Sequence, residues 1–347
     1  MTPLEKIIGA IIEAEGPMPL DRFMALCLGH PQHGYYMTRD PFGASGDFTT
    51  APEVSQIFGE LIGVWLLNSW VALGSPTRFA VVELGPGRGT LMADILRAVK
   101  AVPEFARGAE VHLVETSPVL RRLQNEKLGE VKWHDTVETL PALPSFIIAN
   151  EFFDALPIRQ FENRGGRWFE RCIGYGDSKL KMGLVPAASQ LGEEGVHEVS
   201  PVSVAIAEDL GTHIAKCGGM ALIIDYGHLK SGAGDSLQAL RRHEFVSVLD
   251  SPGEVDVTAH VDFEALAKAF MMGGAELLPM LTQGQFLKAM GLDMRTEKLA
   301  AKLEGQARTD FLSASARLAD ADKMGNLFKV MAVAQKNRQP IYPFEEA

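Results

Sequence analysis

The sequence predicts a doubly wound α/β fold. Short apolar runs alternate with segments of helical spacing, and the first of these runs ends in a cluster of glycines. Short apolar runs bounded by turn residues are typical of strands buried in a parallel sheet, and the helices between them cover both faces of that sheet. We therefore expect a Rossmann-like sheet. Its strands are predicted at residues 79–84, 111–115, 131–134, 146–149, 221–225 and 327–334.

An N-terminal helical cap is predicted before the first strand. Residues 3–15, 19–28 and 54–73 show the apolar spacing of helices. A segment this short buries its own apolar faces poorly, so we expect it to pack on the rest of the chain. The predicted domain organisation is a cap at residues 1–76, followed by an α/β domain at residues 77–347.

A β-rich insertion is predicted after the fourth strand, at about residues 158–200. Aromatic-rich flanks surround the turn Asn163-Arg164-Gly165-Gly166, a pattern that is typical of a β-hairpin. Residues 202–216 have helical spacing and return the chain to the fifth strand. The segment that follows this strand, residues 226–260, is predicted to consist mainly of loops.

The balance of charges bears on the class of partner. Lys and Arg number 33 against 44 Asp and Glu, which gives a formal net charge of −11. An acidic surface repels phosphate backbones, so nucleic acid is a poor candidate ligand. A basic or arginine-containing protein partner fits this balance better. The sequence leaves the oligomeric state open.

Cysteine usage and hydropathy bear on the compartment. Cys27, Cys172 and Cys217 form no Cys-x-x-Cys pair, which argues against a disulfide framework and a zinc site, and we expect no metal. The most apolar stretch, residues 54–73, is interrupted by polar residues and indicates a buried helix rather than a membrane span. The N-terminal residues resemble neither a signal peptide nor a transit peptide, so we expect a bacterial, cytoplasmic protein.

The strongest chemical signal is the turn Gly85-Pro86-Gly87-Arg88-Gly89, which follows the first predicted strand. Glycines there permit positive φ and let a ligand approach the backbone closely. The spacing Gly-x-Gly-x-Gly differs from the Gly-x-Gly-x-x-Gly of dinucleotide sites, so an NAD-dependent dehydrogenase is the second candidate. The first candidate is a methyltransferase that uses S-adenosylmethionine. This cofactor has no pyrophosphate, and the nearby carboxylate of Glu83 favours its sulfonium cation.

Polar residues at later strand ends strengthen this interpretation. In an open α/β sheet, ligands bind beyond the carboxyl ends of the strands. Glu115 ends the second strand, where a carboxylate can accept hydrogen bonds from ribose hydroxyls. Asp135 follows the third strand, where an acceptor can meet an adenine amino group, and Asn150 ends the fourth. The predicted cofactor-binding residues are Glu83, Gly85, Pro86, Gly87, Gly89, Glu115, Asp135 and Asn150.

Longer motifs run through nearly the whole chain. They comprise His30-Pro31-x-x-Gly34-Tyr35-Tyr36, Gly46-Asp47-Phe48-Thr49-Thr50-Ala51-Pro52-Glu53, residues 83–90, Ala149-Asn150-Glu151-Phe152-Phe153-Asp154-Ala155-Leu156-Pro157, Ile224-Asp225-Tyr226-Gly227-His228, residues 282–287, and Met324-Gly325-x-Leu327-Phe328-Lys329-Val330. On these motifs the chain resembles the MidA family of class I methyltransferases. That family includes the mitochondrial complex I assembly factor that methylates an arginine of a complex I subunit.

The resemblance implies a seven-stranded methyltransferase fold, S-adenosylmethionine as methyl donor and a protein arginine as acceptor, with a respiratory complex I subunit as one candidate. It leaves a second function open, that of a non-catalytic or weakly catalytic assembly factor. A guanidinium acceptor needs carboxylates to hold it. Glu151 and Asp154 lie just past the fourth strand, and Asp47 lies in an irregular cap segment that can close over the same site. These three are the predicted catalytic residues, although Asp154 is equally suited to organising the turn.

Overall fold

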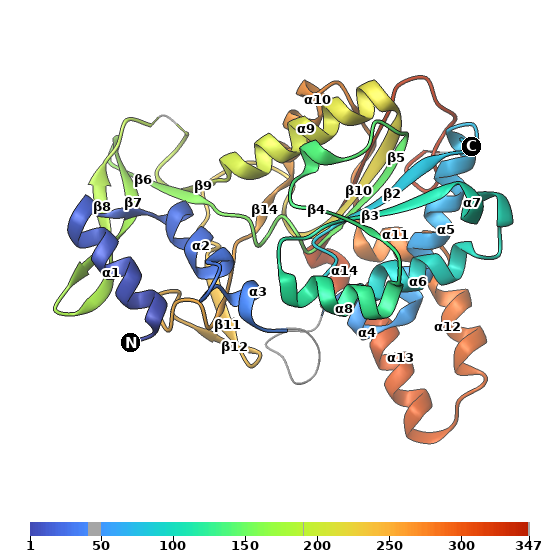
Figure 1. The fold of residues 1–347 in the computed structure, drawn as a ribbon, viewed down its shortest axis with the longest axis horizontal. Coiled ribbons are helices and arrows are strands. Elements are labelled where there is room, and N and C mark those ends of the chain that lie inside the picture. The colour runs from blue at the N-terminus through green and yellow to red at the C-terminus, as the bar shows by residue number, and fades with distance from the viewer. Residues whose placement is uncertain (41–49, 190, 346–347) are drawn as a thin grey trace.

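The computed structural model describes residues 1–40, 50–189 and 191–345. These residues form two lobes that lie side by side (Figure 1). One lobe has a central sheet with helices on both faces, and the other is built mainly from antiparallel strands with the first helices of the chain packed on them. The predicted α/β fold class is confirmed. Among the described residues, no helix is long and apolar enough to cross a membrane.

The central sheet has the strand order β4-β3-β2-β5-β10-β17-β15, with β14 and β16 paired at its margin. Its strands are β2 (Phe79–Leu84), β3 (Ala109–Val114), β4 (Lys132–His134), β5 (Ser145–Asn150), β10 (Gly219–His228), β14 (Val261–Asp262), β15 (Glu276–Leu277), β16 (Leu281–Thr282) and β17 (Phe328–Ala334). The strands β2, β3, β4, β5 and β10 run parallel, and β17 is antiparallel to β10. The six predicted strands are all present. The two-residue strand β15 leaves no apolar run by which the sequence could predict it.

Residues along each strand alternate between two apolar cores. In β2, Phe79 and Val81 join one core, and Ala80 and Val82 join the other. Helices cover both cores, as expected for a parallel sheet that is buried on both faces. The first core is covered by α4 (Ala51–Val54), α5 (Gln56–Ala72), α6 (Thr90–Val99), α7 (Pro103–Gly108), α11 (Gln283–Ala289), α12 (Leu292–Ala300), α13 (Gly305–Ala319) and α14 (Met324–Leu327), with α8 (Pro118–Leu128) beside α6. The second core is covered by η1 (Val137–Thr139), α9 (Pro201–Cys217) and α10 (Phe263–Met272).

The second lobe has its own apolar core. Leu4 and Ile8 of α1, Phe23 of α2 and Ile173 of β7 are fully buried in it. Its helices are α1 (Pro3–Glu15), α2 (Leu20–Gly29) and α3 (Tyr35–Thr38). Its larger sheet contains β1 (Met18–Pro19), β6 (Arg159–Arg164), β7 (Arg167–Gly176), β8 (Lys179–Pro186) and β9 (Gly195–Val199), so the predicted hairpin is confirmed as β6 and β7. Its smaller sheet contains β11 (Gln238–Arg241), β12 (Glu244–Val246) and β13 (Asp256–Thr258).

The observed packing differs from two sequence-based expectations. Residues 1–76, predicted as one cap, contain two packing units, because α1 and α2 join the core of the second lobe whereas α5 joins the core of the central sheet. Residues 226–260, predicted to consist mainly of loops, contain β11, β12 and β13. Each of these strands has only three or four residues. That is too few for the alternation of a half-buried strand to be recognised in the sequence.

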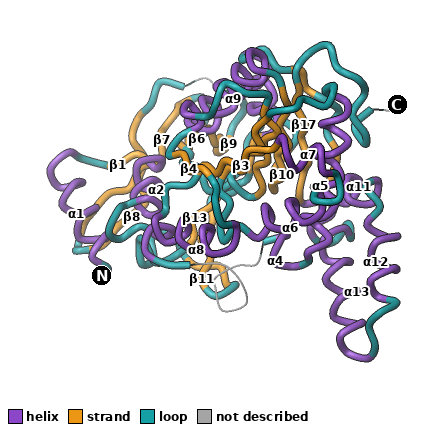
Figure 2. The backbone as a smooth tube through the Cα atoms, turned by 45° about the vertical axis from the view of Figure 1, so that its right-hand side comes forward, coloured by secondary structure: helices purple, strands orange, loops and turns teal. Residues whose placement is uncertain are grey.

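The helical hairpin formed by α12 and α13 extends away from the sheet (Figure 2). Within the sheet, the chain changes direction between β2 and β5. From β2 it runs outward through β3 and β4, and it then returns to β5 on the other side of β2. Such a switch point opens a crevice at the carboxyl ends of the two strands, where ligands bind in sheets of this kind.

A close contact between α5 and α6 gives a test of the packing. A Cβ atom added at Gly59 would lie 2.5 Å from the Cβ of Asp94. We therefore expect Gly59→Ala to lower the free energy of unfolding by about 1–3 kcal/mol through overpacking. The control is Gly29→Ala, since Gly29 is also helical and no described atom lies within 4 Å of a Cβ added there. Urea unfolding of both variants measures this, and equal effects would contradict the observed contact.

Candidate active site

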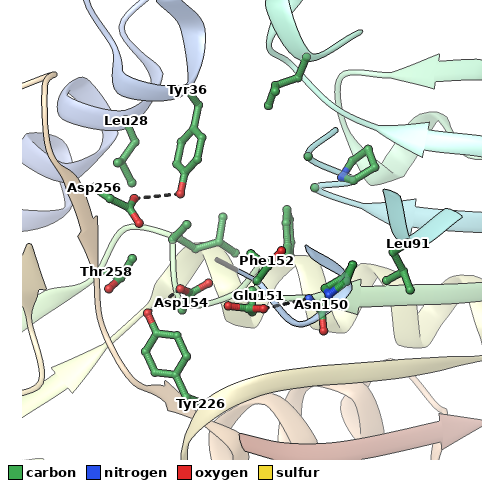
Figure 3. A pocket seen from close by; sticks show the side chains of 18 of the residues that line it. Leu28, Tyr36, Leu91, Asn150, Glu151, Phe152, Asp154, Tyr226, Asp256 and Thr258 are labelled. Atoms are coloured by element: carbon green, nitrogen blue, oxygen red, sulfur yellow. Dashed lines mark hydrogen bonds between the residues drawn. The ribbon is translucent and has the colours of Figure 1, made fainter. Parts of the chain in front are cut away.

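A cavity of about 590 Å³ lies at the switch point, between the two lobes. Its wall is formed on one side by residues at the ends of β2, β3 and β5, and on the other by residues of α3, β11 and β13. Figure 3 shows Tyr36, Asp256 and Thr258 on one side, with Asn150 and Leu91 on the other. The predicted site residues that line the cavity are Glu83, Gly85, Pro86, Gly87, Glu115, Asn150, Glu151 and Asp154.

The glycine turn adopts a backbone conformation that requires glycine. Gly85, Gly87 and Gly89 have φ values of 59°, 53° and 74°. Such values are unfavourable for residues with a side chain. The N–H of Gly85 donates to the carbonyl of Val114 at 3.0 Å, and the carbonyl of Gly87 accepts from Nε2 of Gln124 at 2.7 Å. The turn is therefore held from the neighbouring strand and from α8, with Gly89 as the N-cap residue of α6.

Glu83 faces the cavity from the end of β2. Its side chain is 3% exposed, and its Oε2 atom has no hydrogen-bond partner within the described part of the chain. Burial raises the pKa of the carboxyl to about 8. A buried carboxyl oxygen without a donor is costly unless a ligand supplies one. Glu83 therefore suits a cationic ligand.

Glu115 faces the cavity from the turn that follows β3. Its Oε1 atom accepts from the N–H of Ser117 at 2.8 Å, and its Oε2 atom accepts from Nε2 of Gln124 at 3.2 Å. Burial raises the pKa of this carboxyl. Both oxygens are fixed and retain lone pairs for further hydrogen bonds. This is the geometry required to receive a pair of ribose hydroxyls.

Two predicted residues that the structure describes do not line the cavity. Asp135 points to solvent with a side chain that is 78% exposed, and it forms an ion pair with Arg121 at 2.7 Å instead of lining the cavity. Thr116 and Leu120 line the cavity on that side. Gly89 shapes the turn without lining the cavity. Asp47 lies outside the described residues.

The turn after β5 carries the other two predicted carboxyls. Glu151 is partly buried, and its Oε1 atom accepts from the N–H of Ala51 at 3.1 Å and from Nδ2 of Asn150 at 3.2 Å. Burial, followed by the neighbouring Asp154, raises the pKa of Glu151 to about 8. Oδ2 of Asp154 accepts from the hydroxyl of Tyr226 at 2.6 Å, and burial raises the pKa of Asp154 to about 6.

Two buried acceptor atoms beside this turn lack a donor. They are Oδ1 of Asn150 and Oδ1 of Asp154, neither of which has a hydrogen-bond partner among the residues that the structure describes. Both residues line the cavity and are less than a tenth exposed. Buried acceptors without a donor are satisfied by a ligand that has several N–H groups.

Asp225 holds the turn after β5, a role that the sequence analysis did not assign to it although it lies in one of the motifs. It is fully buried within β10, directly after the apolar residues 221–224, and its Oδ2 atom accepts from the N–H groups of Phe152, Phe153 and Asp154 at 3.2, 3.0 and 3.3 Å. Burial, followed by the Asp154 carboxyl, raises its pKa well above the usual range. Its position directly after an apolar run is the signal that could have identified it.

These residues fit S-adenosylmethionine. The glycine turn offers close backbone approach, Glu83 and Asn150 offer acceptors without donors, and Glu115 offers a fixed carboxylate. The volume suits a ligand of this size together with a side chain of a second substrate. Among the described residues, no group of three or more His, Cys, Asp and Glu side chains could hold a metal ion.

Gly87→Val tests the turn. A β-branched residue at a φ of +53° is strained by roughly 1–2 kcal/mol, and Gly87 is part of the cavity lining. We expect binding of S-adenosylhomocysteine to fall below detection in calorimetry. The control is Gly165→Val, because Gly165 has a φ of +56° in the β6–β7 hairpin and no described atom lies within 4 Å of the added Cβ. Retained binding in the Gly87 variant would contradict this assignment.

The raised pKa of Glu151 predicts a pH-dependent stability. Because its folded pKa of about 8 exceeds its ordinary value of 4.5, the stability it contributes is complete below pH 4.5 and is lost as the pH rises through 8. Glu151→Gln removes this titration. The Tm of the variant minus the Tm of the unaltered chain should therefore increase by about 2 °C or more from pH 5 to pH 8.5. Thermal unfolding at both pH values measures the difference, and a constant offset would contradict the raised pKa.

Comparison with known proteins gives the family. The family model described as "Putative S-adenosyl-L-methionine-dependent methyltransferase" matches residues 61–279. The protein named "Protein arginine methyltransferase NDUFAF7, mitochondrial" from Xenopus tropicalis is 36% identical over 94% of this chain and 84% of its own length. The protein of the same name from Homo sapiens is 35% identical over 97% of this chain and 85% of its own length.

A solved structure agrees with this result. A protein from Burkholderia thailandensis, described as a "likely methyl transferase" and bound to S-adenosyl-homocysteine, is 29% identical and superimposes with a TM-score of 0.84. The match covers 95% of this chain and 91% of that chain. These findings give no support to the dehydrogenase alternative. The chain belongs to the MidA family, and it is a methyltransferase that uses S-adenosylmethionine.

Proposed function

We propose that this enzyme transfers the methyl group to an arginine of a protein acceptor. The observation that carries this proposal is the buried carboxyl of Asp154, which lines the cavity and has one oxygen without a donor among the described residues. The relatives from Xenopus tropicalis and Homo sapiens are named as protein arginine methyltransferases, which supports it. From the motif resemblance, a respiratory complex I subunit is the first acceptor to examine. A cytoplasmic location stays a prediction.

A guanidinium group complements this side of the cavity. It is a planar cation with five N–H donors and no acceptor. Asp154 and Glu151 present carboxyl oxygens whose pKa values are about 6 and about 8 because of burial. A cation bound beside them stabilises their ionised forms and lowers both pKa values. The acceptor therefore brings the charge that these buried carboxyls need.

The same carboxyls account for the chemistry on the acceptor side. S-adenosylmethionine supplies, when bound, a methyl group on a sulfonium. Asp154 and Glu151 hold the guanidinium and keep its positive charge away from the attacking nitrogen. That nitrogen loses one proton on methylation, and an ionised carboxyl of raised pKa is suited to receive it. Alignment of the two substrates in the cavity provides the rest of the rate enhancement.

Asp154→Asn tests the proposal. The amide keeps an acceptor for the Tyr226 hydroxyl but cannot neutralise a cation, so we expect methyl transfer to fall by about 100-fold or more. Affinity for S-adenosylhomocysteine should stay within about threefold, since the donor side is unchanged. The matched control is Asp177→Asn, because the Asp177 side chain is 88% exposed and bonds only Lys181 in a surface hairpin among the described residues.

The assay uses labelled S-adenosylmethionine with extract of a strain in which the gene is deleted. Mass spectrometry of the same extract locates methylated arginines, with complex I subunits examined first. Loss of arginine methylation in the deletion strain, restored by the Asp177 variant and not by the Asp154 variant, supports the proposal. Full restoration of growth by an inactive Asp154 variant would instead favour the assembly-factor function.

A further inference from the structure

The sheet β12-β11-β13 forms part of the cavity wall in the second lobe. In its register, Leu240 lies opposite Phe245 on one side and opposite Asp256 on the other, and Gln238 lies opposite Thr258. Residues that face each other across antiparallel strands project from the same face of the sheet. All five of these residues line the cavity. Figure 3 shows Asp256 and Thr258 on this wall, across the cavity from Asn150.

The opposite face of this sheet anchors it. Ala239 and Val257 face each other across β11 and β13, and both are fully buried in the core of the second lobe. Val246 of β12 packs against the same core. Burial of one face fixes the sheet in place, so that the other face is presented to the cavity.

The presented face changes from apolar to acidic along one row of residues. Phe245, at the outer end, is 73% exposed, Leu240 in the middle is partly buried, and Asp256 at the inner end is 5% exposed. The hydroxyl of Tyr36 donates to Oδ1 of Asp256 at 2.9 Å and holds that carboxyl in the wall. Phe245 and Leu240 therefore present adjoining apolar surface at the edge of the cavity, where a bound partner can cover it.

We propose that this face is the recognition surface for the methyl acceptor, and that the acceptor is a polypeptide segment with an apolar residue next to its arginine. The inference rests on the proposed arginine transfer. The arginine enters beside Asp256 and Asp154, where the carboxyls complement its charge. The apolar neighbour packs on Leu240 and Phe245.

The dimensions of the row support a peptide rather than a free amino acid. Neighbouring strands lie about 4.8 Å apart, so the two ends of the row are separated by about 10 Å. An extended peptide covers that length in about three residues. Contact with both ends therefore requires a residue beside the arginine. A nucleic acid is disfavoured, because its phosphates would be repelled by the acidic inner end of the row.

Two acetylated and amidated pentapeptides test the inference, Gly-Leu-Arg-Leu-Gly and Gly-Gly-Arg-Gly-Gly. Binding of each is measured by calorimetry with the chain saturated by S-adenosylhomocysteine. We expect the leucine peptide to bind about tenfold more tightly, since burial of one leucine side chain contributes that much. Phe245→Ala should remove this preference. Met272→Ala should keep it, because Met272 is also 73% exposed but lies on α10 outside the cavity lining.

The outcomes separate this inference from the proposed function. Equal binding of the two peptides, no binding of either, or a preference that survives Phe245→Ala would each overturn the recognition surface. None of these results depends on methyl transfer. Failure of the proposed function is recognised instead by unchanged arginine methylation in the deletion strain. Phe245→Leu provides a further check, because a large apolar side chain at this position should restore most of the preference.

Discussion

The buried carboxyl of Asp225 holds the turn on which the acceptor side of the cavity depends. It accepts three backbone N–H groups from residues 152–154, and the carbonyl of Ile224 accepts the N–H of Glu151 at 2.9 Å. Glu151 has a φ of +50°, a left-handed conformation that is unfavourable for a residue with a side chain. Such strain persists where the surrounding structure enforces it. Ile224 and Asp225 of β10 therefore fix, through main chain and side chain together, where Glu151 and Asp154 point.

Both substrates of the proposed arginine transfer are cations, and the cavity concentrates carboxyls that can neutralise them. Burial raises the pKa of Glu83 and of Glu151 to about 8, and that of Asp154 to about 6. Burial favours the protonated form of each of these carboxyls, and a bound cation favours the ionised form. A sulfonium and a guanidinium would repel each other if they met in an apolar cavity. Glu83 on the donor side and Asp154 on the acceptor side supply separate counter-charges, so the two cations can approach each other.

The parts of the molecule that repeat a simple pattern could be predicted from the sequence. Buried parallel strands leave apolar runs, and the turn at Gly85 to Gly89 leaves a spacing that only positive φ explains. Residues placed by tertiary contacts could not be predicted. Asp135 follows a strand as Glu115 does, yet Arg121 binds it at the surface, and no local pattern distinguishes the two. Asp256 belongs to a three-residue strand, and only its pairing with β11 across the sheet shows that it faces the cavity.

The donor and acceptor sides are joined by one short helix, α3. Ser117, whose N–H binds the Glu115 carboxylate, donates its hydroxyl to the carbonyl of Tyr36 at 2.6 Å. The hydroxyl of the same tyrosine donates to Asp256 at 2.9 Å. Tyr36 of the second lobe therefore helps to position two carboxylates on opposite walls, Glu115 through Ser117 and Asp256 directly. The lobe that contains β11, β12 and β13 thus contributes to the site in two ways. It supplies the wall that faces the acceptor, and it fixes that wall relative to the turn that holds the cofactor.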